Sequence, residues 1–375
     1  MRDVDAAVVG AGVVGCAVAL ALARRGAAVA LLEGQPDPGL AASGTNSGVL
    51  HTGFDSAPGQ LETELILRSA DLRDPVLDAL GVPVLRCGAL LRPLSAADHP
   101  AVEGLARNAE RNGVRAWVED GALRVPGEAV TDPVAFTLGL AAAAVRHGAH
   151  LRTRFTVAGL RRGRDGLAVE DETGSELRCR VAVNCAGLHA DAVARLAGDD
   201  SFEIYPRKGE FLVFDPPDRR PLERILLPVP SRGTKGVLVF PTVDGRIVAG
   251  PTAVDQEDKN DWSVRPEARD EIMPRVIAMH PPLDGAEPIG AYAGLRPAGR
   301  SVNYLIGRSR ACDALINVAA IRSTGLTASL GIAERVCGLV EGLGVRLGPE
   351  RPLERGEAAP PMGPWWRRTA EHVAG

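Results

Sequence analysis

The chain has 375 residues, of which 45% are hydrophobic and 24% are charged, and its 43 Lys and Arg against 47 Asp and Glu give a net charge of −4. These ordinary globular values exclude a collagen-like, coiled-coil or wholly disordered chain, and the length suits two domains or one domain with a large insertion. The absence of a long basic run, together with only 4% aromatic residues, argues against a nucleic-acid-binding protein.

The spacing of the cysteines and the apolar stretch near the N-terminus indicate in which cellular compartment the protein is expected. No two of the six cysteines form a CxxC pair, so we expect buried free thiols rather than a disulfide scaffold or a metal site. Residues 6–23 are apolar, but Gly10, Gly12 and Gly15 interrupt them and the residues before them are nearly neutral. We therefore expect neither a signal peptide nor a transmembrane segment, and a cytoplasmic protein.

The N-terminus predicts a strand, a glycine turn, a helix and a second strand within about 33 residues. An apolar strand at residues 6–9 leads into GAGVVG at residues 10–15, a helix follows over residues 13–25, and a second strand at 28–32 ends before Glu33. This arrangement is typical of a dinucleotide-binding βαβ unit, although it does not by itself distinguish FAD from NAD.

The glycines and the acidic residue of that unit each have a physical reason. Gly10 permits the tight turn, Gly12 lets the backbone approach a pyrophosphate, and Gly15 lets the helix pack on the strand. The free N–H groups and the dipole of the helix N-terminus attract phosphate. Glu33 is expected to accept hydrogen bonds from ribose hydroxyls.

Next along the chain comes a segment dominated by small and hydroxyl residues, AASGTNSGVLHTGF at residues 41–54. Such a composition lets the backbone pass close to a large flat ligand. A merely flexible surface loop would not need the embedded Val49-Leu50-His51.

The remaining pattern predicts helices at residues 61–80, 96–112 and 134–147, the last begun by Thr131-Asp132-Pro133, and strands within 82–94, 151–169 and 181–186. Residues 204–290 alternate between β-rich runs and turns, as in an antiparallel sheet. A strand at 315–320 and a helix at 325–339 close the fold. Trp365 and Trp366 in the tail are expected to dock on the body or on a partner.

Together these motifs resemble the FAD-dependent oxidoreductases of the D-amino-acid oxidase superfamily. Within it the chain is most similar to glycerol-3-phosphate oxidases and dehydrogenases, with L-2-hydroxyglutarate dehydrogenases as neighbours. The resemblance spans roughly residues 3–345. It is carried by GAGVVG, Glu33, TNSGVLH at 45–51, Pro58-Gly59 with Leu61, YPRKGEF at 205–211, KGVLVFPT at 235–242, GPTA at 250–253, GLRP at 294–297 and IRSTGLT at 321–327.

The resemblance implies an α/β fold, with a Rossmann-type FAD-binding domain and an α+β substrate domain built on a mixed, largely antiparallel sheet. We expect the FAD-binding domain to be discontinuous, at residues 1–80, 129–200 and 290–345. The substrate domain would then take residues 81–128 and 201–289, and residues 346–375 would form a tail. The implied partners are a small anionic substrate and an electron acceptor, which is oxygen, a quinone or another carrier.

The resemblance also implies roles for particular residues. His51 would act as base, since oxidising an alcohol also removes its hydroxyl proton and histidine exchanges protons readily near neutral pH. Arg296, expected in a turn, Lys235 and Ser323 would bind the anionic end of the substrate. The residues expected to bind FAD are Gly10, Gly12, Val14, Gly15, Glu33, Ser43, Gly44, Thr45, Asn46, Ser47, Gly48, Val157, Ala186, Gly187, Thr324, Gly325 and Leu326.

Glycerol 3-phosphate is the first substrate that the resemblance suggests, and L-2-hydroxyglutarate or another 2-hydroxy acid is the alternative. Arg322 and Thr324 stand where a typical glycerol-3-phosphate oxidase is expected to carry Gln and Pro, beside the substrate pocket, so the identity of the anion stays open. An amine or amino-acid oxidase, a flavin monooxygenase and a flavoprotein without catalysis are weaker alternatives.

Overall fold

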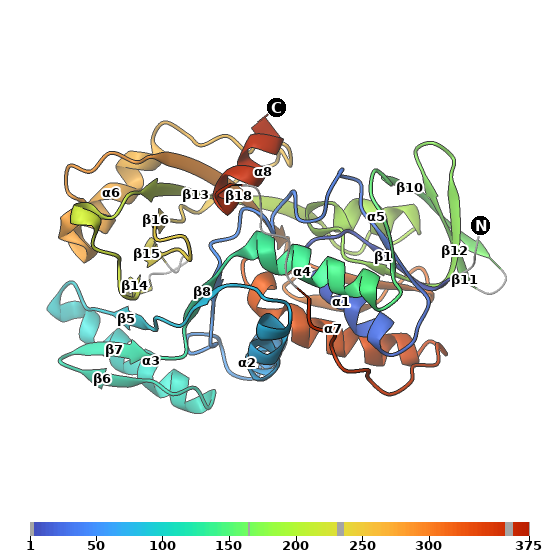
Figure 1. The fold of residues 1–375 in the computed structure, drawn as a ribbon, viewed down its shortest axis with the longest axis horizontal. Coiled ribbons are helices and arrows are strands. Elements are labelled where there is room, and N and C mark those ends of the chain that lie inside the picture. The colour runs from blue at the N-terminus through green and yellow to red at the C-terminus, as the bar shows by residue number, and fades with distance from the viewer. Residues whose placement is uncertain (1–3, 164–165, 231–235, 357–362, 375) are drawn as a thin grey trace.

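The computed structural model describes residues 4–163, 166–230, 236–356 and 363–374. Figure 1 shows an elongated molecule with one large sheet toward each end, and helices packed beside both of them. Lys235, expected to bind the substrate, lies outside the described residues.

The sheet that contains the N-terminal strand has a parallel core covered by helices. Its parallel strands follow the order β9-β2-β1-β12-β20, with β19 antiparallel to β20 and the hairpin β10-β11 beside the first half of β12. The strands are β1 (Val4–Val9), β2 (Val29–Leu32), β9 (His150–Arg152), β10 (Val157–Gly163), β11 (Gly166–Asp171), β12 (Glu176–Asn184), β19 (Leu305–Arg308) and β20 (Leu315–Ala319).

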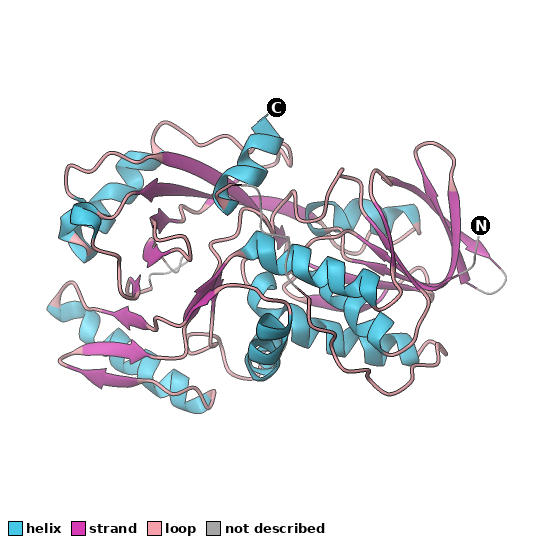
Figure 2. Cartoon of the chain, in the orientation of Figure 1, coloured by secondary structure: helices cyan, strands magenta, loops and turns pink. Residues whose placement is uncertain are grey.

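One face of this sheet is covered by four helices, which pack on one another (Figure 2). They are α1 (Val13–Arg24), α2 (Leu61–Ala79), α4 (Pro133–Arg146) and α7 (Gly325–Glu341). Nine of the twelve residues of α1 are buried, because α1 packs against α4 and α7 as well as the sheet. The short η2 (Gly187–His189) and α5 (Ala190–Leu196) follow β12.

The expected start of the helix after Thr131 is present, and α1 ends before a glycine. Gly26, at φ +82°, follows the end of α1, and Asp132 caps α4 by accepting hydrogen bonds of 2.8 Å from the N–H groups of Val134 and Ala135. Pro133 is the first residue of α4, where its missing N–H costs nothing.

The second large sheet is mainly antiparallel, and among the strand pairs of the described residues only β14-β5 is parallel. Its strands follow the order β18-β13-β16-β15-β14-β5-β7-β6, with β17 also pairing with β13. They are β5 (Ala89–Leu91), β6 (Trp117–Glu119), β7 (Ala122–Val125), β13 (Ile204–Phe214), β14 (Ile225–Leu227), β15 (Leu238–Pro241), β16 (Ile247–Gly250), β17 (Val254–Asp255) and β18 (Gly290–Gly299).

Smaller elements complete the chain. A three-stranded antiparallel sheet joins β3 (Val49–Leu50), β8 (Ala129–Thr131) and β4 (Val84–Leu85). The remaining helices are η1 (Ala96–Asp98), α3 (His99–Arg111), η3 (Pro217–Arg219), α6 (Ala268–Met279), η4 (Pro281–Leu283) and α8 (Trp365–Ala374). The expected fold class is confirmed, with a helix-covered parallel sheet and a mixed, mainly antiparallel one; the domain boundaries remain a prediction.

One expectation about β18 is wrong. Residues 294–297 do not form a turn but lie inside β18, which pairs with β13 over ten consecutive positions from Ile204↔Gly299 to Val213↔Gly290. The Gly and Pro residues that suggested a turn are accommodated by the pairing itself. Pro297 lies opposite Pro206, so both missing N–H donors fall at one position of the ladder.

All six cysteines are free thiols. None of the helices in the described part of the chain combines the length and the apolar character that crossing a bilayer requires.

The C-terminal helix α8 contacts both halves of the molecule (Figure 1). Trp365 is 2% exposed and meets the ring of Tyr292 edge-on at 5.6 Å, and Tyr292 stacks on Phe211 at 4.8 Å. On its other side α8 reaches the segment after β2, where Arg368 donates to the carbonyl of Pro38. The twin tryptophans therefore dock on the body of the chain.

Trp365→Ala is expected to lower the free energy of unfolding by about 3 kcal/mol or more, because it removes a buried indole and leaves a cavity against Tyr292. Urea unfolding of the purified protein measures the change. Trp117→Ala is the matched control, since Trp117 is 38% exposed, and its cost is expected to stay below about 1 kcal/mol. A loss no larger than that of Trp117→Ala would contradict the contribution of the Trp365 packing to stability.

Candidate functional site

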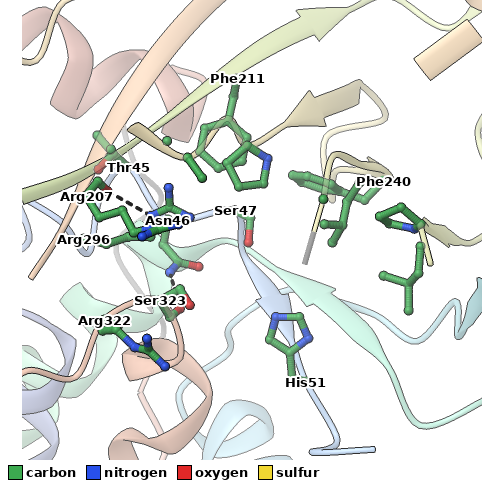
Figure 3. Close-up of a pocket in the computed structure, with 18 of the residues that line it drawn as sticks. Thr45, Asn46, Ser47, His51, Arg207, Phe211, Phe240, Arg296, Arg322 and Ser323 are labelled. Carbon is green, nitrogen blue, oxygen red and sulfur yellow. Dashed lines mark hydrogen bonds between the residues drawn. The ribbon is translucent and has the colours of Figure 1, made fainter. Parts of the chain in front are cut away.

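Two cavities lie next to each other and share the lining residues Ala42, Asn46 and Arg322. The first, about 580 Å³, opens at the carboxyl ends of β1, β2, β12 and β20. The second, about 470 Å³, lies between the segment 42–55 and the faces of β13, β15 and β18, and Figure 3 shows it. Carboxyl ends of parallel strands are where dinucleotides bind in such sheets.

The turn from β1 into α1 forms one wall of the first cavity. Gly10 has a φ of +97°, and a Cβ there would lie 2.6 Å from the carbonyl oxygen of Cys185. Gly15 leaves no room for a side chain against the carbonyl of Gly10, as helix packing on the strand requires. Gly12 has no side chain that could cap α1, so N–H groups in the first turn of α1 remain available to an anion. The N–H of Val13 is already used, because it donates to Ser43 Oγ at 2.9 Å.

Glu33 closes β2 at the rim of the first cavity. Its two carboxylate oxygens accept hydrogen bonds from the N–H groups of Ala11 at 2.7 Å and Gln35 at 2.9 Å. Burial raises the pKa of Glu33 above its ordinary value. Each carboxylate oxygen retains a further lone pair that ribose hydroxyls can use, so the wall suits a nucleotide ribose.

Eleven of the residues expected to bind FAD line the first cavity. They are Gly10, Gly12, Val14, Glu33, Ser43, Asn46, Val157, Ala186, Gly187, Gly325 and Leu326. The N–H groups at the start of α1, the carboxylate of Glu33 and small residues that leave room for a flat ring are thus brought together from six separate segments. The residues present fit an FAD molecule.

The other six expected FAD contacts lie elsewhere. Thr45 and Ser47 line the second cavity instead, and Gly15 packs inside the βα turn. A side chain at position 44 would collide with Thr369, so Gly44 is required there. Gly48 has a φ of +78°, and a side chain at this position would collide with the carbonyl of Thr131. These glycines shape the segment rather than the cavity wall.

Thr324 points away from both cavities. Its hydroxyl donates to Glu62 at 2.8 Å and lies 2.7 Å from the hydroxyl of Tyr304, so it does not cap α7. The sequence predicts that Thr324 binds FAD, but its hydroxyl is engaged by the partly buried carboxylate of Glu62 and by the phenol of Tyr304, and Thr324 is not among the residues that line the first cavity.

Sequence reasoning missed the part of the first cavity that comes from the other sheet. Lys259, Asn260 and Trp262, in the loop after β17, line it together with Thr156 and His189. Lys259 is fixed there by an ion pair of 2.8 Å with Asp191 on α5. No periodicity or motif marks this loop, since its position depends on how the two sheets are joined.

In the second cavity, His51 forms a pair with the buried Glu128. His51 Nδ1 lies 3.0 Å from Glu128 Oε2, and the Glu128 side chain is fully buried. The other carboxylate oxygen, Oε1, accepts from the N–H of Thr52 at 2.6 Å and from its hydroxyl at 2.8 Å. A carboxylate can only accept, so Nδ1 carries the hydrogen and Nε2 is left with a lone pair.

The backbone around this pair is held by other side chains. Arg73 donates to the carbonyls of His51 at 2.9 Å and Gly127 at 3.0 Å, and burial lowers the pKa of Arg73. Thr327 on α7 accepts from the N–H of His51 at 3.1 Å. Glu128 itself could not be assigned from the sequence, because it stands in a turn 77 residues away from its partner.

Three backbone carbonyls hold the guanidinium of Arg296 at the second cavity. Its Nε donates to the carbonyl of Arg207 at 2.9 Å, and its Nη2 donates to those of Lys208 and Thr252 at 2.8 Å each. Burial lowers its pKa to about 10, so it stays charged at neutral pH. Gly209 makes this position available, because a Cβ there would lie 3.0 Å from Nη2.

The remaining candidates differ in how they face the second cavity. Ser323, Arg207 and Arg322 line it, and Figure 3 shows them grouped with Arg296 and Asn46 on the side opposite Phe240. Lys208 does not line it; its buried ammonium pairs with Asp261 at 2.7 Å.

Comparison with known proteins gives one family match and several relatives. A family model described as FAD dependent oxidoreductase matches residues 5–339. A glycerol 3-phosphate dehydrogenase of Caloramator mitchellensis is 28% identical over 362 residues, which cover 92% of this chain and 75% of that protein. A glycerol 3-phosphate oxidase of Mycoplasma pneumoniae is 28% identical over 369 residues, covering 91% of this chain and 95% of that one.

A second kind of relative and a solved structure extend the comparison. The mitochondrial L-2-hydroxyglutarate dehydrogenase of Mus musculus is 30% identical over 277 residues, covering 66% of this chain and 60% of that protein. The solved structure of L-alpha-glycerophosphate oxidase from Mycoplasma pneumoniae with FAD bound has a TM-score of 0.86 at 26% identity, and covers 95% of this chain and 98% of that one.

Gly12→Ala is expected to weaken FAD binding at least about tenfold while the fold is kept. Within 4 Å the added methyl would meet only Ser43 Oγ, at 3.0 Å, but it would stand in the wall of the first cavity. Titrating the apoprotein with FAD and following flavin fluorescence measures the affinity. Gly104→Ala, where a methyl meets nothing within 4 Å, is the control; equal affinities in both variants would remove Gly12 from the FAD site.

Proposed function

Since the chain belongs to the FAD-dependent oxidoreductase family, we propose that it oxidises a small anionic 2-hydroxy compound with His51 as the base. The family and its FAD cofactor, expected from the sequence, are thereby confirmed. The observation that supports the proposed reaction is the placing of the His51–Glu128 pair and of Arg296 in one cavity, beside the cavity that fits FAD.

Bound FAD supplies the acceptor for the hydride that leaves the substrate carbon. The chain's own residues handle the proton and the charge. His51 Nε2 takes the hydroxyl proton as the C–H bond breaks, and the carboxylate of Glu128 faces the imidazolium that results. Arg73 and Thr327 hold the backbone of His51, so the imidazole keeps its orientation.

The substrate anion binds at the cationic side of the second cavity. Arg296 has already lost much of its hydration to three carbonyl contacts, and its Nη1 has no hydrogen bond within the described residues. An anion at Nη1 therefore gains a charge-assisted hydrogen bond at little further desolvation cost. The hydroxyl of Ser323, also in the lining, is a second donor for the same anion.

The relatives' names offer two substrates for this site. Glycerol 3-phosphate is the first to test, because relatives named for it align with more than nine-tenths of this chain. L-2-hydroxyglutarate is the second, from relatives that align with about two-thirds of it. The electron acceptor, which is oxygen, a quinone or another carrier, stays part of the proposal.

Glu128→Gln is expected to slow substrate reduction of the FAD about 100-fold or more without releasing the FAD. In this variant the N–H of Thr52, which can only donate, binds the amide oxygen of the introduced glutamine at the position of Glu128 Oε1. The amide NH₂ of the same side chain then faces His51 Nδ1. Nδ1 must then accept, the hydrogen moves to Nε2, and the base loses its lone pair. Anaerobic stopped-flow spectroscopy measures the rate.

Glu334→Gln is the control for that variant, because Glu334 is a half-exposed carboxylate paired with Arg68 outside both cavities. Its rate is expected to match the unmodified enzyme. Glu128→Gln reducing its FAD at the unmodified rate would contradict the assigned tautomer and the base.

Anaerobic bleaching of the flavin absorbance tests the reaction as a whole. We expect at least one compound among glycerol 3-phosphate, L- and D-2-hydroxyglutarate, lactate and malate to bleach the band within seconds to minutes. Amino acids and the matching non-hydroxylated acids serve as controls. Bleaching by amino acids alone would replace the proposed alcohol oxidation with amine oxidation.

A further inference from the structure

Arg207, Arg296 and Arg322 lie on one side of the second cavity and Phe240 lies on the opposite side (Figure 3). The apolar wall comes from the mixed sheet and from the segment after His51. Its members are Phe54, Leu91, Phe211, Leu227, Leu238 and Phe240. Five of these six are buried, and Leu238 is half-buried, so the wall is a fixed surface rather than a set of mobile side chains.

The cationic side carries less uncompensated charge than its three arginines suggest. Arg207 pairs with Asp255 at 3.1 Å, and Arg322 lies 3.7 Å from Glu62. Arg296 differs from both, because its hydrogen bonds go to neutral carbonyls rather than to a carboxylate. Among the described arginines of this lining, Arg296 therefore keeps a charge that no hydrogen-bonded carboxylate of the described residues offsets, which matches one monoanionic group.

The apolar wall bears on the rest of the substrate. Among the described residues of the lining, every lysine or arginine is on the side of Arg296, and the acidic Asp55 offers no attraction to a second anion. A second carboxylate or a polar hydroxymethyl group against Leu227 and Phe240 would lose its hydration without a described donor in return. An aliphatic or aromatic group would instead gain from burial there.

From these contacts we infer that the preferred substrate is a monocarboxylic 2-hydroxy acid with an apolar side chain. The inference rests on the proposed alcohol oxidation and narrows its substrate class. The carboxylate binds Arg296, the hydroxyl faces His51, and the side chain packs on the wall formed by Leu227, Leu238 and Phe240. The reaction yields the 2-oxo acid, with the hydroxyl proton going to His51 and the hydride to the FAD.

A graded series of substrates tests this inference on the FAD-loaded enzyme. Lactate, 2-hydroxybutyrate, 2-hydroxy-4-methylpentanoate and 3-phenyllactate share the carboxylate and hydroxyl but differ in apolar size. We expect the rate constant for flavin reduction divided by the dissociation constant to rise about tenfold or more from lactate to 2-hydroxy-4-methylpentanoate. L-2-hydroxyglutarate and glycerol 3-phosphate are measured beside them and are expected to react less well than the best apolar acid.

Adjacent leucines on β14 give a matched pair of variants. Leu227 lines the cavity, whereas Leu226 packs on the opposite face, with the cluster around Ile272. Leu227→Ala is expected to lower the preference for 2-hydroxy-4-methylpentanoate over lactate about threefold to tenfold. Leu226→Ala also loses an apolar side chain but is expected to leave that preference unchanged.

The results distinguish failure of the inferred substrate class from failure of the proposed alcohol oxidation. Reduction by glycerol 3-phosphate or L-2-hydroxyglutarate, with weak or equal reduction by the whole apolar series, overturns the inference and leaves the proposed oxidation standing. Equal loss of preference in Leu226→Ala and Leu227→Ala likewise overturns the role of the wall. No reduction by any 2-hydroxy compound overturns both.

Discussion

The antiparallel pairing of β13 with β18 is the constraint on which both cavities depend. These two long strands run from the region of the first cavity into the mixed sheet, and their ten-position register fixes where each side chain falls (Figure 1). Gly209 and Gly294 are directly opposite each other in this register. A Cβ at Gly209 would press on the guanidinium of Arg296, and one at Gly294 would lie 2.9 Å from the carbonyl of Thr45. Gly209 on β13 therefore leaves room for the guanidinium of Arg296, and Gly294 on β18 leaves room for the loop at Thr45.

That loop, residues 41–54, joins the two cavities chemically as well as in space. Ser43 binds the N–H of Val13 at the start of α1, and Asn46 lines both cavities and donates to the carbonyl of Ser323. The same segment then supplies His51, whose ring is oriented by a carboxylate from the turn before β8. Because cofactor contacts and the base lie on one short segment, a shift of this loop changes both together.

The buried charges show how the chain keeps such a site stable. The side chain of Glu128 is fully buried, but within the described residues its carboxylate is bound by His51 and Thr52, and Arg73 lies beside it on the neighbouring carbonyls. Arg296 is satisfied by backbone carbonyls instead of a carboxylate, which leaves its charge available to a ligand. Burying a charge without partners would cost several kcal/mol, so both side chains need their hydrogen bonds. The charge of Glu128 serves to orient His51, whereas the charge of Arg296, bound by neutral carbonyls, can serve a ligand.

The sequence alone determined the features that depend on neighbours along the chain. The GAGVVG turn, the cap at Asp132 and the loop around His51 each follow from local spacing, because backbone geometry and capping act within a few residues. Tertiary structure decided the rest: Glu128 as the partner of His51, Arg296 inside a strand rather than a turn, and Thr324 bound to Glu62 rather than lining the first cavity. These outcomes join residues tens to hundreds of positions apart. Strand register and burial set them, and no local pattern encodes either.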